Sequence, residues 1–281
     1  MDDEAVETDE LIAAVREKVF AAAVDSIDWY TAPICLYHDG KLIPDRSGVL
    51  LQIGSLHFVV TAAHLNNDHQ LKDAMDHGYD PCITMPAKGL LPVVLGGTKY
   101  LSTKSKSEDI TVILLTDEIV AQLRDHYRFL RLTDVAPLDT LRPTRLYLIN
   151  GFPLNLVRQE PNAKRSEVWR YVTCRYQGNI DDVENFDPDI HLALHYDKHS
   201  YSGDGIRVSP KGMSGCGVWY VAEGHVAPHV SPESLKLVGI QTAWHPRLQY
   251  ALATRIRLVL YIIWRYYPDS RDVMKLHGLR F

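Results

Sequence analysis

Residues 210–219 have the sequence PKGMSGCGVW, which sets Ser214 among glycines and continues into an apolar segment. Small residues on both sides of the serine allow the backbone to turn sharply and leave the hydroxyl exposed. Gly212 also permits a backbone conformation in which successive N–H groups point at one spot. This suits a nucleophile beside an oxyanion hole, where backbone donors stabilise the charge that forms on an attacked carbonyl. By itself the motif is weak, and a glycine-rich hairpin turn explains it better.

Two upstream stretches change this interpretation, because each ends or begins an apolar strand with a residue that serine chemistry needs. Residues 58–64, FVVTAAH, form a β-rich run that ends in small residues and His64. Residues 107–115, SEDITVILL, place Asp109 at the mouth of another apolar strand. The histidine and the aspartate are 45 positions apart, and the aspartate and Ser214 are 105 apart. These spacings suit two successive barrels.

The TAAH motif, the Asp109 segment and the G-x-S-G motif together resemble the three catalytic blocks of trypsin-like (chymotrypsin-fold) serine peptidases, of a bacterial and intracellular type. The resemblance covers roughly residues 30–260. It implies an all-β fold of two six-stranded antiparallel β-barrels, to which the sequence adds an N-terminal, a linker and a C-terminal helix. In chain order we expect an N-terminal amphipathic helix at 1–29, a first barrel with His64 and Asp109 at 30–135, a second barrel with Ser214 at 136–253, and a C-terminal helix and tail at 254–281.

The three helices are predicted from apolar residues at helical spacing. Residues 8–27 predict an amphipathic helix on the body of the protein, with a partner-binding arm as the alternative. Residues 116–130 open with Thr-Asp-Glu, which is typical of a helix N-terminus, and predict a short helix between the barrels. Residues 254–266 predict the terminal helix, whose apolar run is too short to cross a membrane. Residues 158–166 are charged and contain a proline, so we expect a loop there.

Composition is that of an ordinary globular protein and argues against several classes of partner. Of 281 residues, 46% are hydrophobic and 23% charged, which fits a large buried core. The net charge of −5 gives no reason to expect nucleic acid or an anionic membrane as a partner. We therefore expect a protein or peptide substrate, no nucleic acid and no membrane.

The cysteines and the N-terminus favour a cytoplasmic protein. The four cysteines, at positions 35, 82, 174 and 216, form neither a disulfide framework nor a C-x-x-C metal pattern. The first ten residues are acidic, whereas a secretory signal needs positive charge followed by an apolar run. Reduced thiols in a cytoplasm are the simpler interpretation.

Three histidines, at positions 191, 195 and 199, stand four residues apart. On a helix this spacing would give a metal-binding face, but the apolar residues between 190 and 196 alternate as they do in a strand. We interpret these histidines as structural, and the sequence predicts no metal and no cofactor.

The resemblance assigns catalytic roles to three residues, and their chemistry agrees with it. Ser214 would be the nucleophile, and His64 the base that takes its proton and returns it to the leaving amine. Asp109 would fix the histidine tautomer and balance the charge of the imidazolium. The N–H groups of Gly212 and Ser214 would form the oxyanion hole. Taken singly, the three residues are also explained as a core histidine, a strand-capping acid and a turn serine.

Several positions depart from the family pattern. Met213 stands where members activated by cleavage have an aspartate that pairs with a new N-terminus, so activation by clipping is not expected. Val208 lies where trypsins keep the acid that selects Lys or Arg. Thr242, Ala243 and Trp244 match the substrate-pairing strand, but Trp244 replaces a common glycine and would narrow or close the specificity pocket. The expected substrate-binding residues are Val208, Thr242, Ala243 and Trp244.

The sequence therefore predicts a serine endopeptidase that acts through an acyl-enzyme and whose substrate strand adds to the edge at 242–244. The alternative is a catalytically silent peptidase-fold module that binds peptides or a protein. A third hypothesis is a protease that stays silent until an activating protein partner orders the oxyanion loop. The resemblance suggests this last kind of role because intracellular members often act as regulated effectors, including in bacterial defence.

Overall fold

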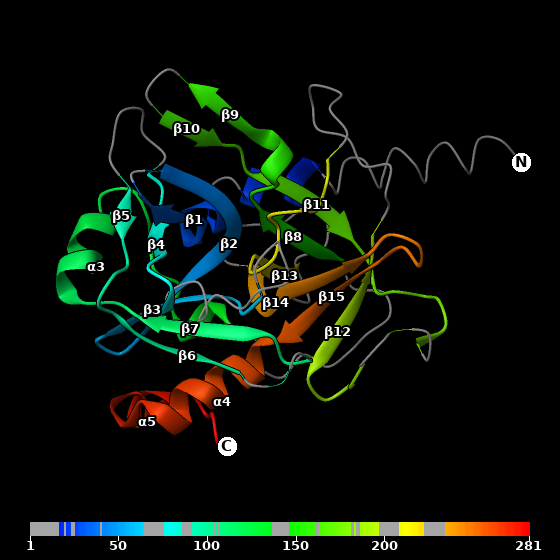
Figure 1. Ribbon diagram of the computed structural model, residues 1–281. Helices are drawn as coiled ribbons and strands as arrows, with labels where there is room; N and C mark the ends of the chain where they lie inside the picture. The colour runs from blue at the N-terminus through cyan, green and yellow to red at the C-terminus, as the bar shows by residue number, and fades with distance from the viewer. Residues whose placement is uncertain are drawn as a thin grey trace, which may run out of the picture.

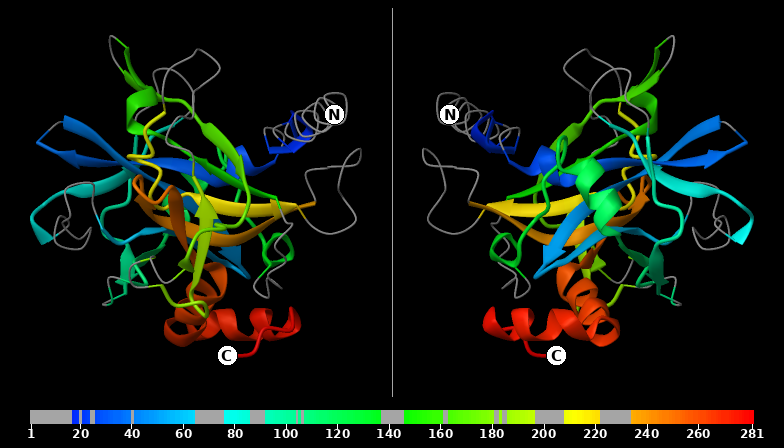
Figure 2. Two further views of the ribbon diagram at one scale, coloured as in Figure 1. Left: turned by 90° about the vertical axis from the view of Figure 1, so that its right-hand side faces the viewer. Right: turned by 90° about the vertical axis from the view of Figure 1, so that its left-hand side faces the viewer.

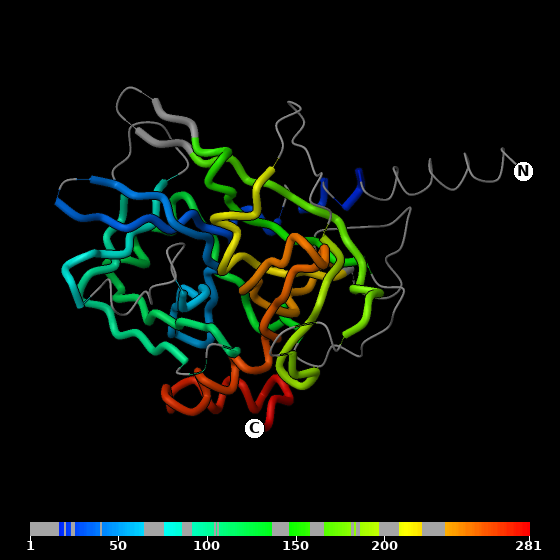
Figure 3. The backbone as a smooth tube through the Cα atoms, turned by 45° about the vertical axis from the view of Figure 1, so that its right-hand side comes forward, coloured from blue at the N-terminus to red at the C-terminus, as the bar shows by residue number. Residues whose placement is uncertain are grey.

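Runs of β-branched and aromatic residues form two antiparallel sheets that lie side by side in the computed structural model (Figure 1). The chain builds the first sheet before it begins the second (Figure 3). The structure describes residues 17–19, 21–23, 26–39, 41–64, 76–85, 92–103, 105, 107–136, 146–160, 163–180, 183, 186–196, 208–221 and 234–281.

The first sheet has the strand order β5-β4-β1-β2-β3-β7-β6. Its strands are β1 (Thr31–His38), β2 (Lys41–Ile53), β3 (Leu56–Ala62), β4 (Asp80–Ile83), β5 (Val93–Val94), β6 (Lys99–Ser102) and β7 (Ile110–Leu114). Gly54 and Ser55 form a tight turn between β2 and β3, and Gly54 has a φ of 62° that favours glycine. This turn fixes the register of β3 and hence the position at which the strand ends near His64.

The second sheet has the order β11-β8-β13-β14-β15-β12. Its strands are β8 (Tyr147–Gly151), β11 (Trp169–Thr173), β12 (His191–His195), β13 (Gly217–Val221), β14 (Leu235–His245) and β15 (Tyr250–Arg255). The central strands β13 and β14 are each paired on both sides, with register shifts at Val218/Trp219 and at Gln241/Ala243. The turn before β13 lies against the first sheet, where Ser47 donates to the Ser214 carbonyl.

Helices link the sheets and cover one end of the molecule. Helix α3 (Asp117–Leu123) follows β7, and the side chain of Thr116 accepts a hydrogen bond from the N–H of Ile119 as its N-cap. Helices α4 (Ile256–Tyr266) and α5 (Arg271–Leu276) follow β15 and lie beneath the sheets (Figure 2). Short 3-10 helices complete the described elements at Ile27–Tyr30, Leu132–Asp134, Leu154–Leu156 and Pro268–Ser270.

One apolar cluster joins both sheets and α4, so the barrels share part of their core. The first sheet contributes Phe58 and Val112, and the second contributes Trp219 and Leu237, all buried. Ile263 of α4 packs in the same cluster. Burial of this shared surface fixes how one sheet sits against the other, and the residues between the sheets depend on that arrangement.

The all-β prediction is confirmed, with three differences in detail. The first sheet contains seven of the described strands, because the two-residue strand β5 pairs with β4. Residues expected to form a loop instead form the paired strands β9 (Val157–Glu160) and β10 (Ala163–Ser166). Helix α4 begins two residues later than expected, because Thr254 and Arg255 still pair in β15.

The N-terminal helix is described only in part. Residues 17–19 and 21–23 are helical, and Val19, Ala22 and Ala23 are buried in the shared cluster. The rest of the expected helix lies outside the described residues. No helix within the described part of the chain is long and apolar enough to span a membrane.

Candidate active site

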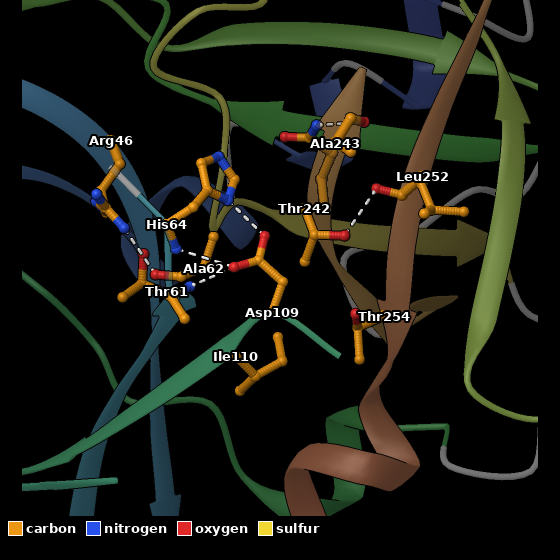
Figure 4. Close-up of polar contacts among 12 residues, drawn as sticks. Arg46, Thr61, Ala62, His64, Asp109, Ile110, Thr242, Ala243, Leu252 and Thr254 are labelled. Carbon is orange, nitrogen blue, oxygen red and sulfur yellow. Dashed lines mark hydrogen bonds and ion pairs between the residues drawn. The ribbon is translucent and has the colours of Figure 1, made fainter. Parts of the chain in front are cut away.

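His64 and Asp109 meet because they flank two paired strands. Strand β3 pairs with β7 so that Ala62 lies opposite Ile110. His64 follows the end of β3 by two residues, and Asp109 directly precedes β7. The pairing therefore brings the two residues together where β3 ends and β7 begins. The His64 ring is directed at the Asp109 carboxylate (Figure 4).

The Asp109 carboxylate holds both the backbone and the ring of the histidine. Its Oδ1 accepts hydrogen bonds from the N–H of His64 (2.9 Å) and of Ala63 (3.1 Å). Its Oδ2 contacts Nδ1 of the His64 ring. Because a carboxylate accepts, Nδ1 carries the proton in this pair and Nε2 presents its lone pair. The Asp109 side chain is 11% exposed and that of His64 is 29% exposed, so the pair is screened on one side and open on the other.

Asp109 adopts a strained backbone conformation. Its φ is 47°, in the left-handed region that a residue with a side chain seldom occupies. Such strain persists only where surrounding contacts hold the residue, and it is concentrated at functional sites. Here the N–H of Asp109 donates to Ser105 and its carbonyl accepts from Ala63.

The serine turn depends on two glycines with a φ of 90°, Gly212 and Gly215. A Cβ on Gly215 would lie 2.2 Å from both the Ser47 carbonyl oxygen and the Thr61 hydroxyl oxygen, so only glycine fits. Thr61 belongs to β3, three residues before His64. This close approach places the turn that carries Ser214 against the end of the strand that carries His64.

Ser47 of β2 connects the serine turn to the first barrel. Its N–H donates to the Ser214 carbonyl (3.0 Å) and its hydroxyl donates to the Gly212 carbonyl (2.9 Å). The same hydroxyl accepts from the N–H of Phe152 (2.9 Å). Ser47 is fully buried, so these bonds are not exchanged with water.

Two backbone donors of the turn have no acceptor among the described residues. Within the turn, the N–H groups of Met213, Gly215 and Cys216 each donate to a carbonyl of the protein. Those of Gly212 and Ser214 donate to no residue that the structure describes. The Ser214 hydroxyl, which is half-buried, likewise makes no hydrogen bond to a described residue in this conformation.

Two of the four expected substrate-binding residues, Val208 and Trp244, share one apolar cluster, whereas Ala243 packs against another. Val208, 3% exposed, packs with Met213 and Cys216, and Trp244 packs against the same cluster. The Trp244 ring meets Tyr196 edge-on, with 5.8 Å between ring centroids. Burial raises the pKa of the Cys216 thiol, which suits a packed residue and not a nucleophile.

The expected substrate-pairing segment has one unpaired side among the described strands. Strand β13 pairs with β14 only as far as Gly217 opposite Ile240. Beyond that point β14 continues to His245 with β15 as its described partner. The Thr242 hydroxyl donates to the Leu252 carbonyl (3.4 Å). The backbone from Thr242 to Trp244 therefore borders the space beside the serine turn.

A buried arginine, which the sequence analysis missed, holds the backbone two residues before His64. Arg46 is 2% exposed, pairs with the carboxylate of Asp45, and donates from Nη1 to the Ala62 carbonyl (2.7 Å; Figure 4). Ser47, the next residue, was missed as well. The only signal in the sequence was a run of polar residues, 45–47, just before an apolar strand, and such a run does not reveal which residues it contacts.

The fold is similar to that of a solved protein described as the crystal structure of Deg5. The comparison gives a TM-score of 0.51 at 14% sequence identity and covers 90% of this chain and 96% of that chain. No protein-family profile and no curated protein matches the sequence. At this identity the likeness shows the fold alone, a chymotrypsin-like pair of antiparallel half-barrels.

Proposed function

We propose that this protein is a serine endopeptidase that hydrolyses peptide bonds through an acyl-enzyme. The observation that carries the proposal is the His64–Asp109 pair beside the serine turn. The carboxylate fixes the ring with its proton on Nδ1, so Nε2 is the basic nitrogen. That tautomer is the one that a general base for Ser214 requires.

In the proposed reaction, Ser214 Oγ attacks the carbonyl carbon of the scissile peptide while its proton passes to Nε2 of His64. The resulting imidazolium is balanced by Asp109. The oxyanion of the tetrahedral intermediate accepts hydrogen bonds from the N–H groups of Gly212 and Ser214, the two donors that no described residue uses.

Collapse of this intermediate breaks the C–N bond, and the leaving amine takes the proton from Nε2. Water then attacks the ester formed on Ser214, again with His64 as base, and releases the acid product. Before chemistry, the Ser214 hydroxyl must turn toward His64, a hydrogen bond that tightens in many enzymes only when substrate binds.

The substrate is proposed to be an extended peptide that pairs with the backbone at Thr242–Trp244. Two observations support this: the segment runs beyond the end of β13, and it borders the serine turn. Main-chain pairing of this kind binds a peptide through its backbone and leaves side-chain selection to pockets. Val208, Met213 and Trp244 are the residues in position to line the first such pocket.

A fluorophosphonate probe tests the proposal, because it needs an activated serine and no known substrate. We expect labelling of the wild type at Ser214 and none in Ser214→Ala or His64→Ala, with unchanged circular dichroism. Ser209→Ala is the matched control, since Ser209 lies in the same segment and is half-buried like Ser214. Labelling that persists in Ser214→Ala contradicts the assignment.

The second candidate function is a peptide-binding module without catalysis. The packing of Trp244 against Tyr196 favours it, because this contact occupies the region where a side chain of the substrate would enter. This candidate predicts no labelling under any condition but saturable binding of extended peptides, weakened when Trp244 is changed to Ala.

A further inference from the structure

The segment that ends in Asp109 belongs to the first barrel but is held by two side chains of the second. Nε2 of His191 lies 2.7 Å from the Ser107 carbonyl oxygen. The hydroxyl of Thr254 donates to the Glu108 carbonyl, also at 2.7 Å. The two carbonyls directly before Asp109 are therefore both hydrogen-bonded from across the interface between the barrels.

The tautomer of His191 follows from its partners. The N–H of Asp187 donates to Nδ1 of the ring at 2.9 Å, so Nδ1 has no proton. A carbonyl oxygen only accepts, so Nε2 carries the proton and donates to Ser107. His191 is fully buried and uses both ring nitrogens. The ring is thus a neutral, fixed donor aimed at the Asp109 segment.

The two donors form a pair by virtue of the sheet. Strand β12 pairs with β15 so that His191 lies directly opposite Thr254. Residues opposite each other on antiparallel strands point their side chains to the same face. His191 and Thr254, which are paired across β12 and β15, therefore present two adjacent donors to two consecutive carbonyls of the first barrel. Figure 4 shows Thr254 near Asp109.

We propose that His191 and Thr254 are positioning residues that hold Asp109 in its catalytic conformation, an inference that rests on the proposed function. Asp109 has a φ of 47°, which its own side chain disfavours. Relaxation to an ordinary φ would rotate the peptide that carries the Glu108 carbonyl and turn the carboxylate away from His64. The two hydrogen bonds from the second barrel oppose that rotation, since they fix both preceding carbonyls.

This pair also makes the acid of the proposed triad depend on the docking of the barrels. The His64–Asp109 contact lies wholly within the first barrel, yet its geometry is set by residues more than 80 positions further along the chain, as the sequence separation of 84 for Ser107 and His191 shows. A displacement of about 1 Å at such a site costs roughly 100-fold in rate.

Two substitutions of His191 separate its two hydrogen bonds. The amide nitrogen of Gln reaches the place of Nε2, so His191→Gln keeps a donor for Ser107. The carbonyl oxygen of Asn takes the place of Nδ1, so His191→Asn keeps only the acceptor for Asp187. Thr254→Ser and Thr254→Val form a second pair, which keeps and removes the donor to Glu108. His195→Asn, on the same strand and half-buried, is the control.

Each variant of the full chain is measured in two ways after circular dichroism and thermal unfolding establish that it folds. The first is the rate of fluorophosphonate labelling at Ser214. The second is the low-field proton resonance of the hydrogen bond between Nδ1 of His64 and Asp109, which needs no activity. We expect His191→Asn and Thr254→Val to label about 100-fold more slowly and to shift or lose the resonance. His191→Gln, Thr254→Ser and His195→Asn keep both.

The outcomes distinguish this inference from the proposed function. If the wild type does not label, the proposed function fails, and the resonance alone decides whether His191 and Thr254 position Asp109. Wild-type resonance and labelling in both His191→Asn and Thr254→Val overturn the inference. It is also overturned if Gln and Asn at position 191 are equally impaired, because the effect then reflects packing and not the donor to Ser107.

Discussion

The two loops that build the candidate site are each braced by the opposite barrel, but by different means. The Asp109 segment of the first barrel is held by two side chains of the second, His191 and Thr254. The Ser214 turn of the second barrel is held by one residue of the first, Ser47, through its backbone and hydroxyl. The geometry of the candidate site therefore depends on hydrogen bonds from both barrels.

The source of unusual backbone conformation also differs between the loops. The serine turn uses glycines, Gly212 and Gly215, for which a φ of 90° costs little. The acid segment uses Asp109 itself at a φ of 47°, because a side chain is required at that position. Strain of this kind costs on the order of 1–3 kcal/mol and must be offset by neighbouring contacts.

The largest effect is expected at the acid. Asp109→Asn keeps the side-chain size but replaces an acceptor oxygen with a donor, so it favours the wrong His64 tautomer. We expect turnover to fall on the order of 10⁴-fold with the fold retained. Turnover on a peptide substrate and circular dichroism measure this. Near-normal turnover would show that another acid orients the histidine and would remove the reason for the strained segment.

The next effect tests the brace of the serine turn. Ser47→Ala removes the donor to the Gly212 carbonyl and the acceptor for Phe152, and it keeps the backbone bond to Ser214. Misalignment of the oxyanion donors should lower kcat by roughly 10²–10³-fold, as loss of one such donor does, with little change in KM.

The control for Ser47→Ala is Ser55→Ala, in the exposed turn before β3. A rise in KM with unchanged kcat would place Ser47 in substrate binding instead of in the support of the oxyanion donors.

A smaller effect, in selectivity, concerns the second barrel alone. Val208 is buried in an apolar cluster, and a cation buried there without a partner is strongly disfavoured. We therefore predict cleavage after small or medium uncharged residues, as measured by the cleavage-site profile on a proteome-derived peptide library. A dominant Lys or Arg signal would point to Asp204 or Glu223, which lie outside the described residues.

The smallest expected effect is on the pH dependence of stability, and it arises from a histidine of the first barrel that lies outside the candidate site. His57 of β3 packs edge-on against Phe129, and its Nε2 accepts a hydrogen bond from Arg124 (3.1 Å). Burial, and then the Arg124 charge, lower the pKa of His57 below the ordinary 6.5. In mild acid the unfolded chain therefore binds more protons here than the folded one, and the free energy of unfolding decreases as the pH falls below that ordinary value.

Urea unfolding at neutral and mildly acidic pH measures this decrease. His57→Gln should reduce it, whereas His277→Gln, at the exposed residue that follows α5, should not. An unchanged pH dependence in His57→Gln would show that other groups cause the loss of stability.

Local sequence was sufficient for the parts of the site that depend on short stretches of chain. Small residues with Ser214, a histidine at the end of one β-rich run and an aspartate at the start of another were enough to nominate all three residues. The all-β fold was implied by the family resemblance that these stretches carry. Strand pairing then followed from apolar alternation and turn glycines, as at Gly54. The paired strands at 157–160 and 163–166 were missed because their charged residues have no apolar alternation to reveal a strand.

Only the tertiary structure decided which residues support those three. Ser47 and Gly212 are 165 positions apart, and Ser107 and His191 are 84 apart. His191 was interpreted as structural because the apolar residues around it alternate as they do in a strand. That pattern does not reveal which residues the His191 ring contacts. Such contacts arise when the shared apolar core docks one barrel against the other. A hydrogen bond across that interface depends on the docking geometry, which no local pattern of residues encodes.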